Sequence, residues 1–123
     1  MLDEPGDKEV DALQDLAEKM ESVGAAVDFD RADFARVLET TPRTVSRWLH
    51  REAAPRGASR ERALEIVYVL DRLAKVLRPE AAHDWLLTPN EMLDHEKPVD
   101  LLAGGDYRRV LGAVEALAEG VFV

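Results

Sequence analysis

The sequence predicts an all-α protein in which a helix-turn-helix is followed by a small helical domain. Apolar residues recur at the 3.6-residue period of helices along most of the 123-residue chain, and no segment alternates at period two for long enough to indicate a strand. N-capping residues and prolines precede several of these segments. Although the formal net charge is −9, residues 31–62 hold eight arginines against four acidic residues. One locally basic element in an acidic helical protein needs its own explanation.

Two helices are expected before residue 40. Residues 9–22 place apolar side chains at helical spacing, and Gly24 comes next as a helix stop. A second helix is expected to begin near residue 31, because Asp30 and Asp33 have the spacing of a capping box. The first of these helices is acidic, so the positive charge must lie later in the chain.

The third predicted helix, residues 42–51, carries the local positive charge. Thr41 and Pro42 supply an N-cap and a proline at the first helical position. At 100° per residue its apolar side chains fall on one side and its basic side chains on the other. Two helices joined by a short turn, the second with a cationic stripe, are typical of a helix-turn-helix that enters the DNA major groove. The residues expected to contact operator DNA are Arg43, Thr44, Ser46, Arg47 and Arg51.

The arginine stripe has a second interpretation, in which it is a solvated face balanced by the acidic residues of the protein. DNA binding is favoured by a resemblance to the Xre-type helix-turn-helix, which the stretch matches at Ala35, Thr44, Val45, Ser46, Trp48 and Pro55. Glu39 stands where such proteins usually have glycine, whose tolerance of positive φ suits the turn. A displaced or strained turn is therefore expected at Glu39.

A long helix is expected over residues 60–77, capped by Ser59 after a connector over residues 52–58. Its apolar face is broad, which indicates burial on more than one side. We therefore expect a homodimer built on this helix. The residues expected nearest to the contact are Ile66, Val67 and Leu70.

Shorter helices are expected after it. Pro79, Pro89 and Pro98 each stand at the start of a helical segment, and the Thr88 to Glu91 stretch has the pattern of a full capping box. The last helix, residues 106–119, is amphipathic and ends at Gly120.

The domain division predicted from these elements lies at the connector. Residues 1–58 hold the acidic N-terminal helix and the helix-turn-helix, and residues 59–123 hold the helical remainder with its C-terminal tail.

Several classes of site are absent from the sequence. There is no cysteine, the three histidines lie in different segments without metal-ligand spacing, and no Gly-rich phosphate loop or catalytic constellation is present. We therefore expect no metal, no cofactor and no enzymatic activity. The acidic start has no apolar run, and no stretch approaches a membrane span, so a cytoplasmic protein without a membrane partner is expected.

The C-terminal part shows, in this order, a tryptophan, a "PN" start, a leucine, a second proline, "DLL", a Gly-containing break and a final helix ending in Gly. In this order of residues it closely resembles the toxin-binding domain of the Xre/MbcA/ParS family of antitoxins, and most closely its mycobacterial MbcA-like members. With the helix-turn-helix, the resemblance covers about residues 25–123. The matching residues are Trp85, Pro89, Asn90, Leu93, Pro98, Leu101, Leu102, Tyr107, Val110, Leu111 and Gly120.

The resemblance implies the antitoxin of a type II toxin–antitoxin system, which binds and neutralises a RES-domain toxin that degrades NAD and also represses its own operon. A toxin pocket for the NAD pyrophosphate should be cationic, so an acidic chain with a terminal carboxylate could block it. A stand-alone helix-turn-helix transcriptional regulator is the alternative function, and packing of the tail onto its own core is the alternative for the tail. The implied toxin contacts are Trp85, Glu119, Gly120, Val121, Phe122 and Val123.

Overall fold

Seven α-helices and one short 3₁₀ turn form the part of the chain that the computed structural model describes, which is the backbone of residues 5–120 and the side chains of residues 16–120. The only strand-like pairing within it is an isolated bridge between Asn90 and Glu96. The all-α prediction is confirmed. The elements are α1 (Pro5–Ala26), α2 (Arg31–Leu38), α3 (Pro42–Leu49), α4 (Gly57–Ala74), α5 (Pro79–Leu87), η1 (Glu91–Leu93), α6 (Pro98–Ala103) and α7 (Tyr107–Ala118).

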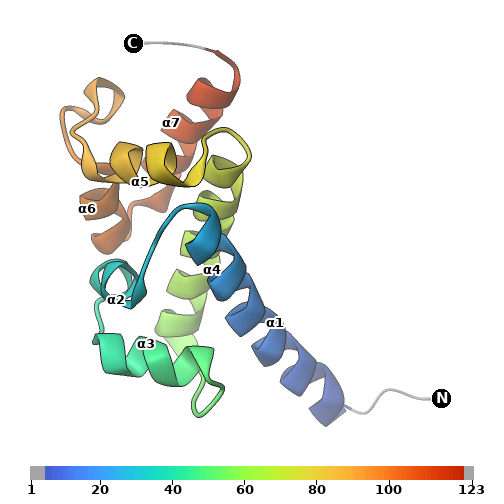
Figure 1. Cartoon of the computed structure of the whole chain (residues 1–123). Coiled ribbons are helices and arrows are strands. Elements are labelled where there is room, and N and C mark those ends of the chain that lie inside the picture. Colours follow the sequence, from blue (N-terminus) through green and yellow to red (C-terminus); the bar gives the residue numbers. More distant parts are fainter. Residues whose placement is uncertain (1–4, 121–123) are drawn as a thin grey trace.

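Helix α4 lies at the centre of the arrangement, and helices from both halves of the chain pack against it (Figure 1). Its apolar positions recur every three or four residues, and Ile66, Val69, Leu70 and Leu73 are at most 1% exposed. Helices α1 and α2 cover it from the N-terminal half, and α5 and α7 from the C-terminal half. The breadth of the apolar face of α4 is thus explained within one chain.

This burial corrects the expected dimer contact. Ile66, Val67 and Leu70 are 1%, 7% and 0% exposed, so they lie inside the core of a single chain and are not available to a second copy. The long helix also begins and ends three residues earlier than residues 60–77. Ser59 lies inside its first turn, and Arg56 is the N-cap without a side-chain hydrogen bond.

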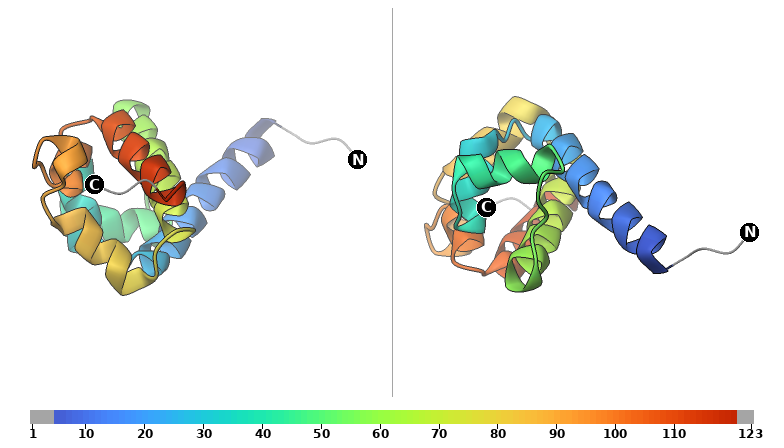
Figure 2. Two further views of the ribbon diagram at one scale, coloured as in Figure 1. Left: turned by 90° about the horizontal axis from the view of Figure 1, so that it is seen from above. Right: turned by 90° about the horizontal axis from the view of Figure 1, so that it is seen from below.

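Helix α1 is longer than residues 9–22 and runs through Gly24 to Ala26. Gly24 therefore does not stop the helix. It is a point of close packing instead, because a Cβ there would lie 3.0 Å from the ring of Phe34 and 3.1 Å from the carbonyl oxygen of Phe29. The helix ends beyond it, where Asp28 takes a left-handed φ of 57° and the Phe29 N–H donates to the Gly24 carbonyl over 2.8 Å. The N-terminal part of α1 runs away from the other helices (Figure 2).

The starts of α2 and α3 are confirmed. The carboxylate of Asp30 accepts from the backbone N–H of Asp33 over 2.8 Å, and the Asp33 carboxylate accepts from the Asp30 N–H over 3.1 Å. Burial raises the pKa of Asp33, and the N–H of Asp30 opposes that rise. Thr41 caps α3 by accepting from the Thr44 N–H over 3.1 Å, with Pro42 at the first helical position.

The capping box expected at Thr88 to Glu91 is wrong. Thr88 is the C-cap of α5, and the next element is the short 3₁₀ turn η1, not an α-helix. The Asn90 side chain caps this turn by accepting from the Met92 N–H. The Asn90 N–H donates to the Glu96 carbonyl over 3.0 Å, so this segment folds into a tight loop. Helices do begin at Pro79 and Pro98, as expected.

Two glycine-to-alanine substitutions should have opposite effects on stability. Gly24→Ala must push apart α1 and the Phe34 ring, and is expected to lower the free energy of unfolding by about 1–3 kcal/mol. Gly112 is an exposed position of α7 with nothing within 4 Å of an added Cβ, so Gly112→Ala should raise the free energy of unfolding by about 0.5–1 kcal/mol. Urea unfolding measures both, and equal effects of the two would contradict the close packing at Gly24.

Candidate DNA and toxin interfaces

Helices α2 and α3 form a helix-turn-helix whose turn keeps its geometry with glutamate at the expected glycine position. Glu39 has φ 54° and ψ 49°, which is the left-handed conformation, and the Thr40 N–H donates to the Ala35 carbonyl over 3.0 Å. An L-residue pays about 1–2 kcal/mol for this conformation. Arg62 of α4 lies 3.5 Å from the Glu39 carboxylate and supports the turn. The turn is strained, as the sequence indicated, but it is not displaced.

The outer face of α3 presents two free arginines. Arg43 and Arg47 are exposed, and neither makes an ion pair with any side chain among residues 16–120. On the opposite face, Val45 is fully buried and Trp48 is 8% exposed. The helix therefore packs through one side and offers cations on the other, which suits contact with DNA phosphates or guanine edges.

Thr44 and Ser46 are half-buried at the edges of that face. The Thr44 hydroxyl accepts from the Thr41 hydroxyl over 3.1 Å, and the Ser46 hydroxyl lies 3.3 Å from Nδ1 of His50. Both hydroxyls thus have partners within α3 and its cap. Because the Thr44 hydroxyl accepts in this bond, its own O–H can still donate to a base or phosphate while the Thr41 bond is kept.

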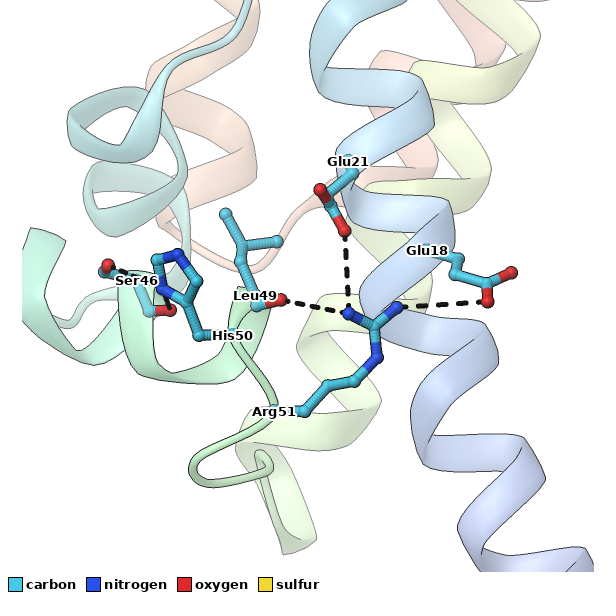
Figure 3. A network of polar contacts seen from close by, with 6 residues as sticks. All are labelled: Glu18, Glu21, Ser46, Leu49, His50 and Arg51. Atoms are coloured by element: carbon cyan, nitrogen blue, oxygen red, sulfur yellow. Dashed lines mark hydrogen bonds and ion pairs between the residues drawn. The ribbon is translucent and has the colours of Figure 1, made fainter.

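Arg51 lies outside the helical stripe, which corrects the predicted helix over residues 42–51. Helix α3 ends at Leu49, and Arg51 lies two residues beyond it with a left-handed φ of 61°. Its guanidinium is directed toward α1, 3.9 Å from a carboxylate oxygen of each of Glu18 and Glu21 (Figure 3). Of the three arginines expected at DNA, Arg43 and Arg47 share a face and Arg51 points elsewhere.

The apolar face of α7 is part of the core and is not a free docking surface. Val110 and Val114 are fully buried and Ala113 is 4% exposed. Two hydrogen bonds of 2.9 and 2.7 Å from Arg72 to the Glu115 carboxylate also join α7 to α4. This paired hydrogen bond raises the pKa of Arg72.

The predicted toxin contacts divide between described and undescribed residues. Trp85 is half-buried and packs against the core. Glu119 is the exposed C-cap of α7, and Gly120 comes next with a φ of 75° and no atom within 4 Å of a Cβ built there. Helix α7 thus ends just before Gly120, as expected. Val121, Phe122 and Val123 lie outside the described residues.

An exposed apolar pair that the sequence analysis missed lies on α4. Leu64 is 40% exposed and Tyr68 is 52% exposed, one helical turn apart. Met92 of η1, at 41%, is the other large hydrophobic side chain exposed among residues 16–120. On a helical wheel Leu64 and Tyr68 fall opposite the buried positions of α4, so plotting that helix alone could have found them.

Residues 16–120 hold no group of three or more His, Cys, Asp or Glu side chains that could bind a metal ion. Over the same described part of the chain, no helix has the length and hydropathy needed to cross a membrane.

Comparisons with known proteins match both halves of this arrangement. The model of the antitoxin Xre/MbcA/ParS C-terminal toxin-binding domain matches residues 63–120. The mycobacterial cidal antitoxin MbcA of Mycobacterium tuberculosis is 42% identical over 87 residues, which are 71% of this chain and 77% of that protein, and MbcA of Mycobacterium bovis matches equally. A probable mycobacterial cidal antitoxin of M. tuberculosis is 32% identical over 113 residues, covering 90% and 96% of the two chains.

A solved structure is also similar to this fold. It is a chain in the crystal structure of the M. tuberculosis MbcT-MbcA toxin–antitoxin complex, with a TM-score of 0.79 and 36% identity. The match covers 88% of the present chain and 97% of that chain. The similarity therefore extends beyond the C-terminal domain and includes most of the helical arrangement.

Proposed function

The chain belongs to the Xre/MbcA/ParS family of antitoxins, and on that premise we propose that it is the antitoxin of an MbcT-MbcA-type toxin–antitoxin pair. The observation that carries the proposal is the likeness, over 88% of this chain, to a chain solved within an MbcT-MbcA complex. It acts by binding its partner and performs no catalytic step of its own. Its proposed place of action is the cytoplasm.

The partner in this proposal is a RES-domain toxin that degrades NAD. A site that binds the NAD pyrophosphate needs positive charge, and a chain of net charge −9 complements it. Helix α7 ends at Ala118, and the two residues after it, Glu119 and Gly120, are exposed. Burying an apolar side chain such as Phe122 in a pocket of the partner would contribute about 1.5–3 kcal/mol.

Docking and blocking are therefore separable functions of the C-terminal part. We expect the body of the C-terminal domain around Trp85 to hold the toxin, and residues 121–123 to obstruct access to NAD. The buried apolar face of α7 contributes only indirectly, by fixing where the tail begins.

A chain ending at Gly120 is expected to bind the toxin more weakly but measurably, and to lose most of its inhibition. The measurement is NAD consumption by the purified product of the neighbouring toxin gene, with each antitoxin variant at saturating concentration. Arg47→Ala is the matched control and should inhibit normally, since Arg47 lies on α3. Full inhibition by the shortened chain would show that the helical body, and not the tail, blocks the toxin. If the intact chain does not inhibit the toxin, the antitoxin proposal is refuted.

The chain is also proposed to repress its own operon through α3. The observation in favour is the pair of exposed arginines, Arg43 and Arg47, that lack ion-pair partners among residues 16–120. A stand-alone transcriptional regulator would use the same face. It would differ in forming no stoichiometric complex with a neighbouring gene product.

Arg47→Ala is expected to weaken binding to the DNA upstream of the operon. If Arg47 contacts a phosphate, the log–log salt slope should fall by about one, and if it contacts guanine the loss should be about 1–3 kcal/mol at one base position. Arg78→Ala, which removes an exposed arginine before α5, is the control of equal charge. If a gel shift gives both variants the same affinity as the unmodified chain, the arginine stripe is a solvated face and not a DNA contact.

Homodimerisation remains part of the proposal, with a different contact. Since Ile66, Val67 and Leu70 are buried within one chain, the exposed pair Leu64 and Tyr68 is the candidate contact on α4. Sedimentation of the intact chain at high micromolar concentration measures the oligomeric state, and a strict monomer would contradict the proposed dimer.

A further inference from the structure

The cap of α3 directs one basic side chain away from the DNA-binding face. The Arg51 N–H donates to the Trp48 carbonyl over 3.1 Å, and the Glu52 N–H donates to the Arg47 carbonyl over 2.9 Å. This pair of bonds is a Schellman motif, with Arg51 at the left-handed position that glycine ordinarily occupies. The chain direction changes at Arg51, so its side chain does not continue the row formed by Arg43 and Arg47.

The side chain of Arg51 instead reaches α1. One of its terminal nitrogens lies 3.4 Å from the Leu49 carbonyl oxygen and 3.9 Å from a carboxylate oxygen of Glu21. The other lies 3.9 Å from a carboxylate oxygen of Glu18 (Figure 3). All three charged side chains are exposed, at 40% for Arg51, 69% for Glu18 and 56% for Glu21. Such exposed pairs are weak, so a phosphate can compete for Arg51.

Helix α1 adds a wider electrostatic effect. Its sequence over Pro5–Ala26 contains six acidic residues and two lysines. It packs against α3, and its N-terminal part extends from the body at the end of the molecule where α3 lies (Figures 1 and 2). DNA that approaches α3 therefore also approaches a negatively charged helix, which repels phosphates.

We propose that α1 is an autoinhibitory element of the DNA-binding face, and that Glu18 and Glu21 act by holding Arg51. Operator binding then requires Arg51 to leave these carboxylates and meet a phosphate. Arg43 and Arg47 make the first contacts with DNA, and the release of Arg51 then determines the affinity of the complex. This inference rests on the proposed operator binding.

The test compares two double variants of equal charge change in the full-length chain. Glu18→Gln with Glu21→Gln removes the carboxylates that hold Arg51. Glu80→Gln with Asp84→Asn removes two exposed carboxylates from α5, far from α3 (Figure 1). The probes are the labelled duplex directly upstream of the chain's own operon and a scrambled duplex of the same composition, titrated over a range of salt concentrations.

The α1 variant is expected to bind the upstream duplex about two- to tenfold more tightly at low salt, and the gain should shrink as salt is raised, because salt screens exposed charges. The α5 variant should change affinity less than twofold by the same estimate. In an Arg51→Ala background, most of the gain from the α1 substitutions should disappear. Thermal melting of each variant establishes that it is folded.

Three results would overturn the proposal. An unchanged affinity of the α1 variant would show that Glu18 and Glu21 do not restrain binding. An equal gain in the α5 variant would show a general charge effect. If the unmodified chain and all variants bind the upstream and scrambled duplexes equally, operator recognition itself fails, and that outcome is distinguished by the behaviour of the unmodified chain.

Discussion

The burial of α4 on several sides is the constraint on which the rest of the molecule depends. Ile66, Leu70 and Leu73 are almost completely removed from solvent, and no single neighbouring helix could cover so broad a face. The apolar face of α4 is covered by α1 and α2 from one half of the chain and by α5 and α7 from the other. The helix-turn-helix and the C-terminal domain are thus assembled on one shared core.

Polar contacts join the same two halves. Arg62 of α4 donates to the carbonyl of Val37, near the end of α2, and to that of Ala103, at the end of α6, over 3.4 and 3.0 Å. Arg36 and Asp100 add an exposed ion pair of 2.6 Å between α2 and α6. The division at residues 58 and 59 stays a prediction, but these contacts lead us to expect that the two parts unfold together.

The shared core also separates the two proposed interfaces. The exposed face of α3 lies near the start of α4, and the open end of α7 lies near the other end of α4 (Figure 1). We expect one chain to be able to hold a toxin and DNA together. Any influence of one partner on the other would have to pass through α4 or through the contacts between α2 and α6.

Local chemistry made the starts of α2 and α3 predictable, whereas most of what was missed depends on tertiary packing. The caps at Asp30 and Thr41 depend on groups three residues apart, so the sequence alone indicates them. The role of Gly24 depends on Phe34, which lies in another helix, and the burial of Ile66 depends on partners far along the chain.

The candidate sites show the same division. The free face of α3 is expected from helical periodicity, and both Arg43 and Arg47 lie where it predicts. The position of Arg51 could not be predicted in this way, because it depends on a left-handed cap without glycine and on carboxylates from α1. The loop after Thr88 was missed because Asn90 pairs with Glu96, a longer-range contact than a capping box.

The shared core can be tested most directly with the two tryptophans of the chain, one in each half. Trp48 is 8% exposed in α3, and Trp85 is half-buried in α5. Trp48→Phe and Trp85→Phe leave one fluorescent reporter each, and urea unfolding is monitored by that fluorescence and by circular dichroism. A shared core predicts that, within each variant, the two signals change together with one midpoint. Tryptophan and helical signals that separate into two transitions in the same variant would show two independent domains and contradict the account.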